Sequence, residues 1–163
     1  RRHEPRRGCF VAEVTESDLD EIFPVIALLE GRAAHEATRK AVAADIAALE
    51  LLHDRLQQCA ADGLVTDYYE ANYAIHEAFI TLADNRWLAQ VIGDLRKILR
   101  LARHKSLHAP GRMQQSLAEH LAVFAALKAR DCDAAEEAMR THLLRQRDAL
   151  RDVARNQQSR LTP

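Results

Sequence analysis

Three histidines lie on or beside the apolar stripes of three different segments of the chain. His76, His120 and His142 each have leucine, isoleucine, phenylalanine or methionine neighbours at helical spacing. Asn72 precedes His76 by one helical turn, so both side chains leave the same face of a helix. Imidazole nitrogens together with an amide oxygen suit zinc, nickel or a similar divalent cation. The spacing therefore permits one metal site formed by Asn72, His76, His120 and His142.

The same histidines also fit a structural role. A single histidine on a buried helix face is more often a hydrogen-bonded core residue than a metal ligand, so spacing alone leaves both interpretations open. The other histidines have no comparable setting, and for them we expect positions on the surface or in linkers: His3, His35, His53, His104 and His108.

The motifs of familiar catalytic sites are missing from the sequence. A carboxylate-bridged di-iron bundle needs Glu-x-x-His on two helices, and only residues 50–53 carry this motif. The chain has no His-Glu-x-x-His motif, no glycine-rich phosphate loop and no Gly-x-Ser-x-Gly turn. We therefore expect a protein that is not an enzyme.

The elements that must position these side chains are helices. Only 5 of the 163 residues are glycine and 4 are proline, and no proline lies between Pro24 and Pro110. Strong helix formers, mainly alanine, leucine, arginine and glutamate, fill these spans. The composition predicts an all-α fold, an antiparallel bundle of about six helices with short connections.

Capping residues, chain breaks and apolar periodicity give the expected helix boundaries. Residues 15–18 can cap the first helix, which contains Pro24. We expect the third helix to start after a Thr66-Asp67 cap and the fourth after an Asp84-Asn85 cap. The other expected ranges are 42–61 for the second helix, 112–129 for the fifth and 133 to about 158 for the sixth.

Charge and cysteine content limit the environment and the partners. The chain has 23 Lys and Arg against 24 Asp and Glu, so it lacks the basic excess of a general nucleic-acid binder. Its longest charge-free apolar run, residues 22–29, is far shorter than the ~20 residues of a membrane span. The 3 cysteines form no Cys-x-x-Cys pair, which fits a reduced cytosol. We expect a cytoplasmic protein with no membrane partner.

Several short motifs follow one another in a characteristic order. A basic and then β-prone stretch (5–12) is followed by a Leu-Glu…Ala-Ala segment (28–34) and by a segment that runs from Asn to His (72–76). An Asn-x-x-Leu motif (85–88), a Glu-His pair (119–120) and an Asp…Ala…Met…His-Leu ending (131–143) come after them. In this order and spacing, the chain resembles the FCD ligand-binding domain of the FadR subfamily of GntR-type bacterial transcription regulators.

This resemblance implies a metal centre. In the metal-binding branch of the family, four positions hold a divalent ion, and they fall on Asn72, His76, His120 and His142 of this sequence. Zinc or nickel is the expected cofactor. Asn72 stands where aspartate is commoner, and its neutral carbonyl oxygen should hold a cation less tightly.

The resemblance also implies an effector sensor. Open coordination positions on the ion can take a small carboxylate, and nearby arginines add bidentate contacts. The first-helix arginine of many members is Ile26 here, so this protein must anchor an acidic effector differently. The candidate anchors lie on the fourth helix and one turn before His120: Arg96, Arg100, Arg103 and Ser116.

The implied domain organisation has three parts. Residues 1–14 are expected to be the remnant of a winged-helix wing and linker, 15–158 the FCD-type effector-binding domain, and 159–163 a tail. Arg6 and Arg7 of the wing remnant could contact DNA phosphates. Operator DNA would be bound through an N-terminal domain missing from this sequence, and the regulator is expected to be a homodimer.

Two other functions remain open at this point. The first is a metal-free regulator of the same fold that binds an acyl or other apolar ligand, with the histidines hydrogen-bonded in the core. The second is a helical metal-dependent enzyme that activates water. Glu77 and Glu119 adjoin His76 and His120 in sequence, but helical geometry points each about 100° away from that histidine.

Overall fold

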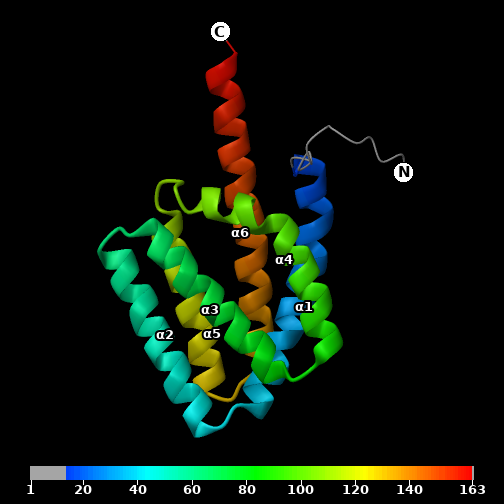
Figure 1. The fold of residues 1–163 in the computed structure, drawn as a ribbon, viewed down its shortest axis with the longest axis vertical. Helices are drawn as coiled ribbons and strands as arrows, with labels where there is room; N and C mark the ends of the chain where they lie inside the picture. Colours follow the sequence, from blue (N-terminus) through cyan, green and yellow to red (C-terminus); the bar gives the residue numbers. More distant parts are fainter. Residues whose placement is uncertain (1–13, 163) are drawn as a thin grey trace, which may run out of the picture.

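The computed structural model describes residues 14–162, except for the side chains of residues 101, 103 and 104. Within the described residues the chain forms six helices and no strand, which confirms the all-α prediction (Figure 1). The helices are α1 (Glu16–Lys40), α2 (Ala43–Ala61), α3 (Val65–Ala83), α4 (Arg86–Ser106), α5 (Arg112–Lys128) and α6 (Cys132–Leu161).

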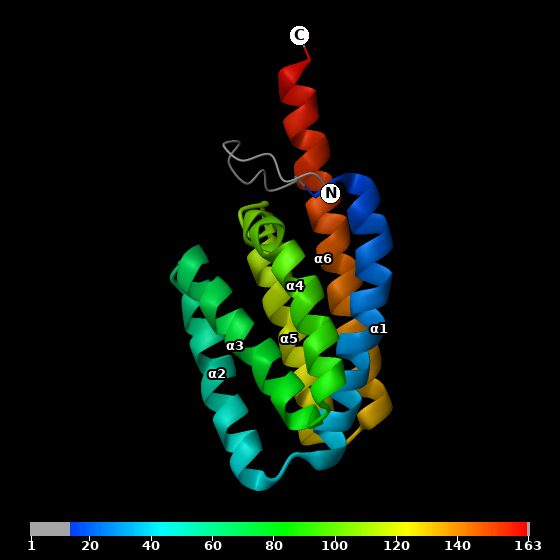
Figure 2. The same ribbon diagram turned by 45° about the vertical axis from the view of Figure 1, so that its right-hand side comes forward.

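α6 is the longest helix, and α1 and α5 pack along it (Figure 2). α2 and α3 form a pair on the side of the bundle away from α6, and α4 contacts α1, α3 and α6. The last turns of α6 extend beyond the other helices. α3, α5 and α6, the three helices that carry the candidate histidines, all contact α1, which brings their inner faces to a common interior.

This interior is built from apolar side chains on the inner faces of the helices. Phe23, Phe79, Leu127 and Leu143, from α1, α3, α5 and α6, are all buried in one cluster. Burial of each such side chain stabilises the fold by about 1.5–3 kcal/mol. Ile26 also lies fully buried in this core, so α1 presents no cation at that position.

Side-chain caps begin three of the helices. Thr15 and Asp18, within the predicted cap of residues 15–18, form a reciprocal capping box at α1. Asn85 Oδ1 accepts hydrogen bonds from the backbone N–H groups of Trp87 and Leu88 at the start of α4. Asp84 does not cap α4; it ends α3 in a left-handed conformation. Asp131 caps α6 through the N–H of Ala134.

Two predicted boundaries were wrong. α3 begins at Val65, before the expected Thr66-Asp67 cap, because Gly63 adopts a left-handed turn and Leu64 N–H closes α2 on the carbonyl of Cys59. α6 continues to Leu161, into the predicted tail. Ion pairs of Arg151 with Asp20 and of Arg155 with Glu16 hold its outer turns against α1.

Some expectations lie outside the described residues. These are the wing remnant with Arg6 and Arg7, His3, and the side chains of Arg103 and His104. Among the described residues, no helix is both long and apolar enough to span a membrane.

Candidate metal centre

The structure brings three histidines from three helices together in the core. His76 of α3, His120 of α5 and His142 of α6 are each only 1% exposed. One ring nitrogen from each lies within 4.8 Å of the others. The ring centroids are 5.1 Å apart for His76 and His120, 5.4 Å for His76 and His142, and 4.4 Å for His120 and His142.

Asn72 completes this cluster from one turn before His76. Its Oδ1 atom lies 2.5 Å from Nε2 of His120 and accepts a hydrogen bond from it. Asn72 is 6% exposed. The three histidines and Asn72 are therefore one buried group, which we call the histidine cluster.

Buried glutamates hold two of the three rings. Nδ1 of His76 donates to Oε1 of Glu30 on α1 at 2.8 Å, and Nδ1 of His142 donates to Oε1 of Glu119 on α5 at 2.7 Å. Arg112 donates to both oxygens of Glu119, at 2.9 and 3.1 Å, so this carboxylate is itself fixed. Metal-binding histidines commonly donate their second ring nitrogen to a carboxylate in this way.

These hydrogen bonds fix which nitrogen carries a lone pair. With Nδ1–H donating to a carboxylate, the Nε2 atoms of His76 and His142 are acceptors, and both are buried without a hydrogen-bond partner. A buried polar atom left unpaired costs about 1–3 kcal/mol. Two such lone pairs in one cluster fit a cation that binds between the rings.

The protonation of the rings favours the same chemistry. Burial lowers the pKa of His76 to about 4, against the opposing effect of Glu30. Burial also lowers the pKa of His142 and holds that of His120 well below its usual range. Burial raises the pKa of Glu119, but its hydrogen bonds with His142 and Arg112 outweigh this effect and leave the pKa below its ordinary value. The neutral imidazole is the form that ligates metal ions.

The sequence did not reveal the role of either glutamate. Glu119, which adjoins His120 in sequence, accepts a hydrogen bond from His142 on another helix. Glu30 belongs to the Leu-Glu motif of the first helix, yet its contact with His76 spans 46 positions of sequence. The available signal was the burial that helical periodicity implies for both positions, because a buried carboxylate needs donors.

His53 was assigned to the surface or a linker, and this prediction was wrong. It is 2% exposed and packs between helices α2 and α5, with its ring stacked on Phe124 at 4.3 Å. Its position on the inner stripe of α2, one turn after Leu49 and one turn before Leu56, was the missed signal. His35 is half-buried and His108 is exposed.

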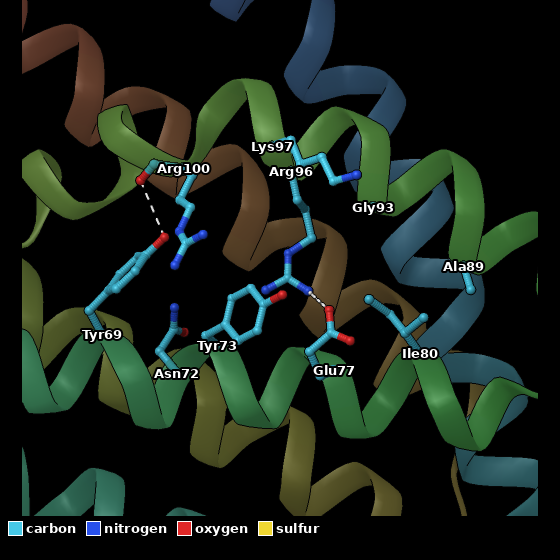
Figure 3. A pocket seen from close by; sticks show the side chains of 10 residues that line it. All are labelled: Tyr69, Asn72, Tyr73, Glu77, Ile80, Ala89, Gly93, Arg96, Lys97 and Arg100. Carbon is cyan, nitrogen blue, oxygen red and sulfur yellow. Dashed lines mark hydrogen bonds and ion pairs between the residues drawn. The ribbon is translucent and has the colours of Figure 1, made fainter.

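A cavity of about 300 Å³ opens between α3 and α4 and is bordered by Asn72 (Figure 3). Arg96 is buried along its wall, donates to Glu77 at 2.7 Å and lies over the ring of Tyr73. Figure 3 shows Arg100 extending from α4 toward Asn72. The cavity adjoins the histidine cluster and is lined largely by polar and cationic groups.

The structure separates the four predicted effector anchors. Arg96 and Arg100 line the cavity. Ser116 lies elsewhere, buried on α5, where its Oγ accepts a hydrogen bond from Tyr68 at 2.9 Å. The side chain of Arg103 is outside the described part. Lys97 and Glu77, which also line the cavity, were not predicted as anchors.

Residues 21–145 match the FCD domain family, and the chain belongs to that family. FCD domains are the effector-binding regulatory domains of GntR-type regulators, as the sequence resemblance predicted. A comparison with curated proteins finds no match.

Several solved structures share this fold, among them McbR/YncC and Lar. McbR/YncC of Escherichia coli superposes with a TM-score of 0.84 at 23% identity, over 92% of this chain and 76% of that chain. Lar of Listeria monocytogenes, described as controlling expression of the agr system, gives 0.71 at 9% identity, over 85% of this chain and 66% of that chain. At these identities the likeness establishes the fold.

Proposed function

We propose that this domain senses a small carboxylate through a divalent metal ion and transmits binding to the DNA-binding part of a GntR-type regulator. Asn72, His76, His120 and His142 would hold the ion, with zinc or nickel as the candidates. The observation that carries the proposal is the pair of buried, unpartnered Nε2 atoms on His76 and His142, each ring held by a glutamate.

The cavity supports a carboxylate as the effector. Its cationic wall, with Arg96, Lys97 and Arg100, outweighs the single carboxylate of Glu77. A bound divalent ion would add positive charge at the Asn72 end and offer open coordination positions to an anion. An apolar ligand, the alternative raised by the sequence, would leave these charged groups without partners. Metal-assisted hydrolysis is also disfavoured, because Glu30 and Glu119 are both engaged by histidines.

Elemental analysis of the protein without a histidine tag tests the metal assignment. We expect about one zinc or nickel ion per chain in the wild type and none in His120→Ala. His108→Ala, which changes an exposed histidine away from the cluster, is the control and should keep the ion. A wild-type protein that holds no ion after metal is added back would contradict the proposal.

An apolar surface supports the expected homodimer. Leu28 on α1 and Trp87 on α4 are 56% and 67% exposed, and Val25, Val91 and Ile98 on the same two helices are also exposed. α1 and α4 contact each other, so these side chains belong to neighbouring elements. We expect sedimentation analysis to give a dimer for the wild type and a monomer for Trp87→Glu. A monomeric wild type would contradict this part of the proposal.

A further inference from the structure

His120 differs from the other two histidines of the cluster. Nδ1 of His76 and Nδ1 of His142 each donate to a glutamate, whereas His120 donates through Nε2 to the amide oxygen of Asn72. An amide oxygen only accepts hydrogen bonds, so the proton of the neutral His120 ring lies on Nε2. In this state Nε2 has no lone pair to offer a metal ion.

Metal binding by Nε2 therefore requires the other tautomer of His120. The ring stays neutral while one proton leaves Nε2 and one is bound at Nδ1, by exchange with solvent. His120 as a whole is 1% exposed, so the new Nδ1–H group then needs an acceptor from the surrounding side chains. A buried N–H without an acceptor would weaken metal binding by the cost of that unpaired donor.

His53 carries a lone pair that matches this need. Its Nδ1–H donates to the backbone carbonyl of Leu49 at 2.7 Å, so its Nε2 is an acceptor. Nε2 of His53 is buried and has no hydrogen-bond partner. The His53 ring faces His120 in an edge arrangement, with a centroid separation of 6.4 Å.

We propose that His53 is a positioning residue for the metal centre, and that its Nε2 accepts the Nδ1–H of His120 when Nε2 of His120 binds the ion. This inference rests on the proposed metal-binding function. Two imidazoles joined by an N–H···N bond have centroids about 5 Å apart, so a shift on the order of 1 Å would close the present gap.

Two substitutions of His53 distinguish the packing role of its ring from the hydrogen-bonding role of its Nε2 acceptor. His53→Phe keeps a flat ring against Phe124 and removes the acceptor, and His53→Gln keeps a side-chain oxygen acceptor. Affinity for zinc or nickel is measured by competition with a chelator. We expect His53→Phe to bind the ion on the order of 10- to 100-fold more weakly, and His53→Gln to recover part of the loss.

Imidazole ¹⁵N spectra give a readout that a purely structural role would not change. In the wild type we expect His120 to change from the Nε2–H to the Nδ1–H tautomer when zinc is added, and Nε2 of His53 to shift as it gains a donor. Denaturation of the metal-free protein should show little difference between wild type and His53→Phe. His108→Gln is the matched control and should leave affinity and spectra unchanged.

The outcomes separate the two proposals. If the wild type binds an ion and His53→Phe binds it equally well, or if the His120 tautomer does not change, the role of His53 is wrong and the metal centre stands. If the wild type binds no ion, both proposals are wrong. If His53→Phe does not fold, the spectra of His53→Gln decide, because the proposal requires the His120 tautomer to change on zinc binding in this variant as in the wild type.

Discussion

Asn72 lies between two regions, the core side with the histidine cluster and the cavity side between α3 and α4, and the charged side chains of these regions differ in how many contacts fix them. On the core side, Glu30 and Glu119 are almost fully buried and each fixes one histidine ring. On the cavity side, Lys97 and Arg100 are exposed, and Arg96 is held by Glu77 and Tyr73. The core side has the rigid, negative surroundings that hold a cation, and the cavity side has the adaptable, positive surroundings that admit an anion.

The largest effect is expected from removing the charge of the buried carboxylate that Arg112 and His142 share. Glu119→Gln leaves the guanidinium of Arg112, only 3% exposed, without its counter-ion. Breaking a buried ion pair in this way costs about 3–5 kcal/mol, so we expect a loss of this size in the free energy of unfolding, measured by chemical denaturation. Glu77→Gln also takes the carboxylate partner from a buried guanidinium, that of Arg96, but this pair is open to water on the half-exposed Glu77 side and Arg96 keeps its contact with the Tyr73 ring, so the loss should be smaller. Equal losses in the two variants would remove the contrast between the sides.

Glu30→Gln tests the support of His76, whose Nδ1 donates a hydrogen bond to this carboxylate. A glutamine can turn its amide nitrogen toward Nδ1 and no longer guarantees the proton there, so Nε2 loses its fixed lone pair. We expect metal affinity to fall on the order of 10- to 100-fold, measured by chelator competition. An unchanged affinity would show that His76 needs no carboxylate partner.

Asn72→Asp changes the residue that borders both the histidine cluster and the cavity, so it should affect metal binding and carboxylate binding in opposite directions. A carboxylate oxygen attracts a divalent cation more strongly than a neutral amide oxygen, so we expect tighter metal binding, by about tenfold. The added negative charge at the edge of the cavity should at the same time weaken binding of a carboxylate effector. Calorimetric titration with metal and then with citrate, as a probe carboxylate, measures both. Weaker metal binding by the variant would contradict the assignment of Asn72.

The smallest effect is expected from removing one exposed arginine on the cavity side. Arg100→Ala removes one exposed guanidinium near Asn72, so we expect weaker binding of a carboxylate probe, by up to about tenfold, with unchanged metal content. Arg32→Ala, an exposed arginine of α1, is the control. A loss of metal in Arg100→Ala would mean that metal binding on the core side depends on the cations of the cavity side.

Composition and helical periodicity predicted the all-α bundle, because these signals are local to each helix. Spacing alone permitted His76, His120 and His142 to share one site, and the sequence resemblance predicted that they do. The partners of those histidines could not be found in this way. Glu30 and His53 reach the cluster from other helices, and their contacts depend on how the helices pack. The sequence resemblance included the Leu-Glu motif but gave Glu30 no role, and His53 was misplaced because a single histidine in a helix carries no strong pattern of its own.

The length of α6 has a mechanical consequence. His142 lies in its first half, and the distance along the helix axis from His142 to Leu161 is about 28 Å at 1.5 Å per residue. If α6 tilts as a rigid rod about the histidine cluster, its last turns, which lie beyond the other helices (Figure 1), move the most. A tilt of about 5° would displace Leu161 by about 2.5 Å, and the ion pairs with Asp20 and Glu16 would transmit part of this motion to the beginning of α1.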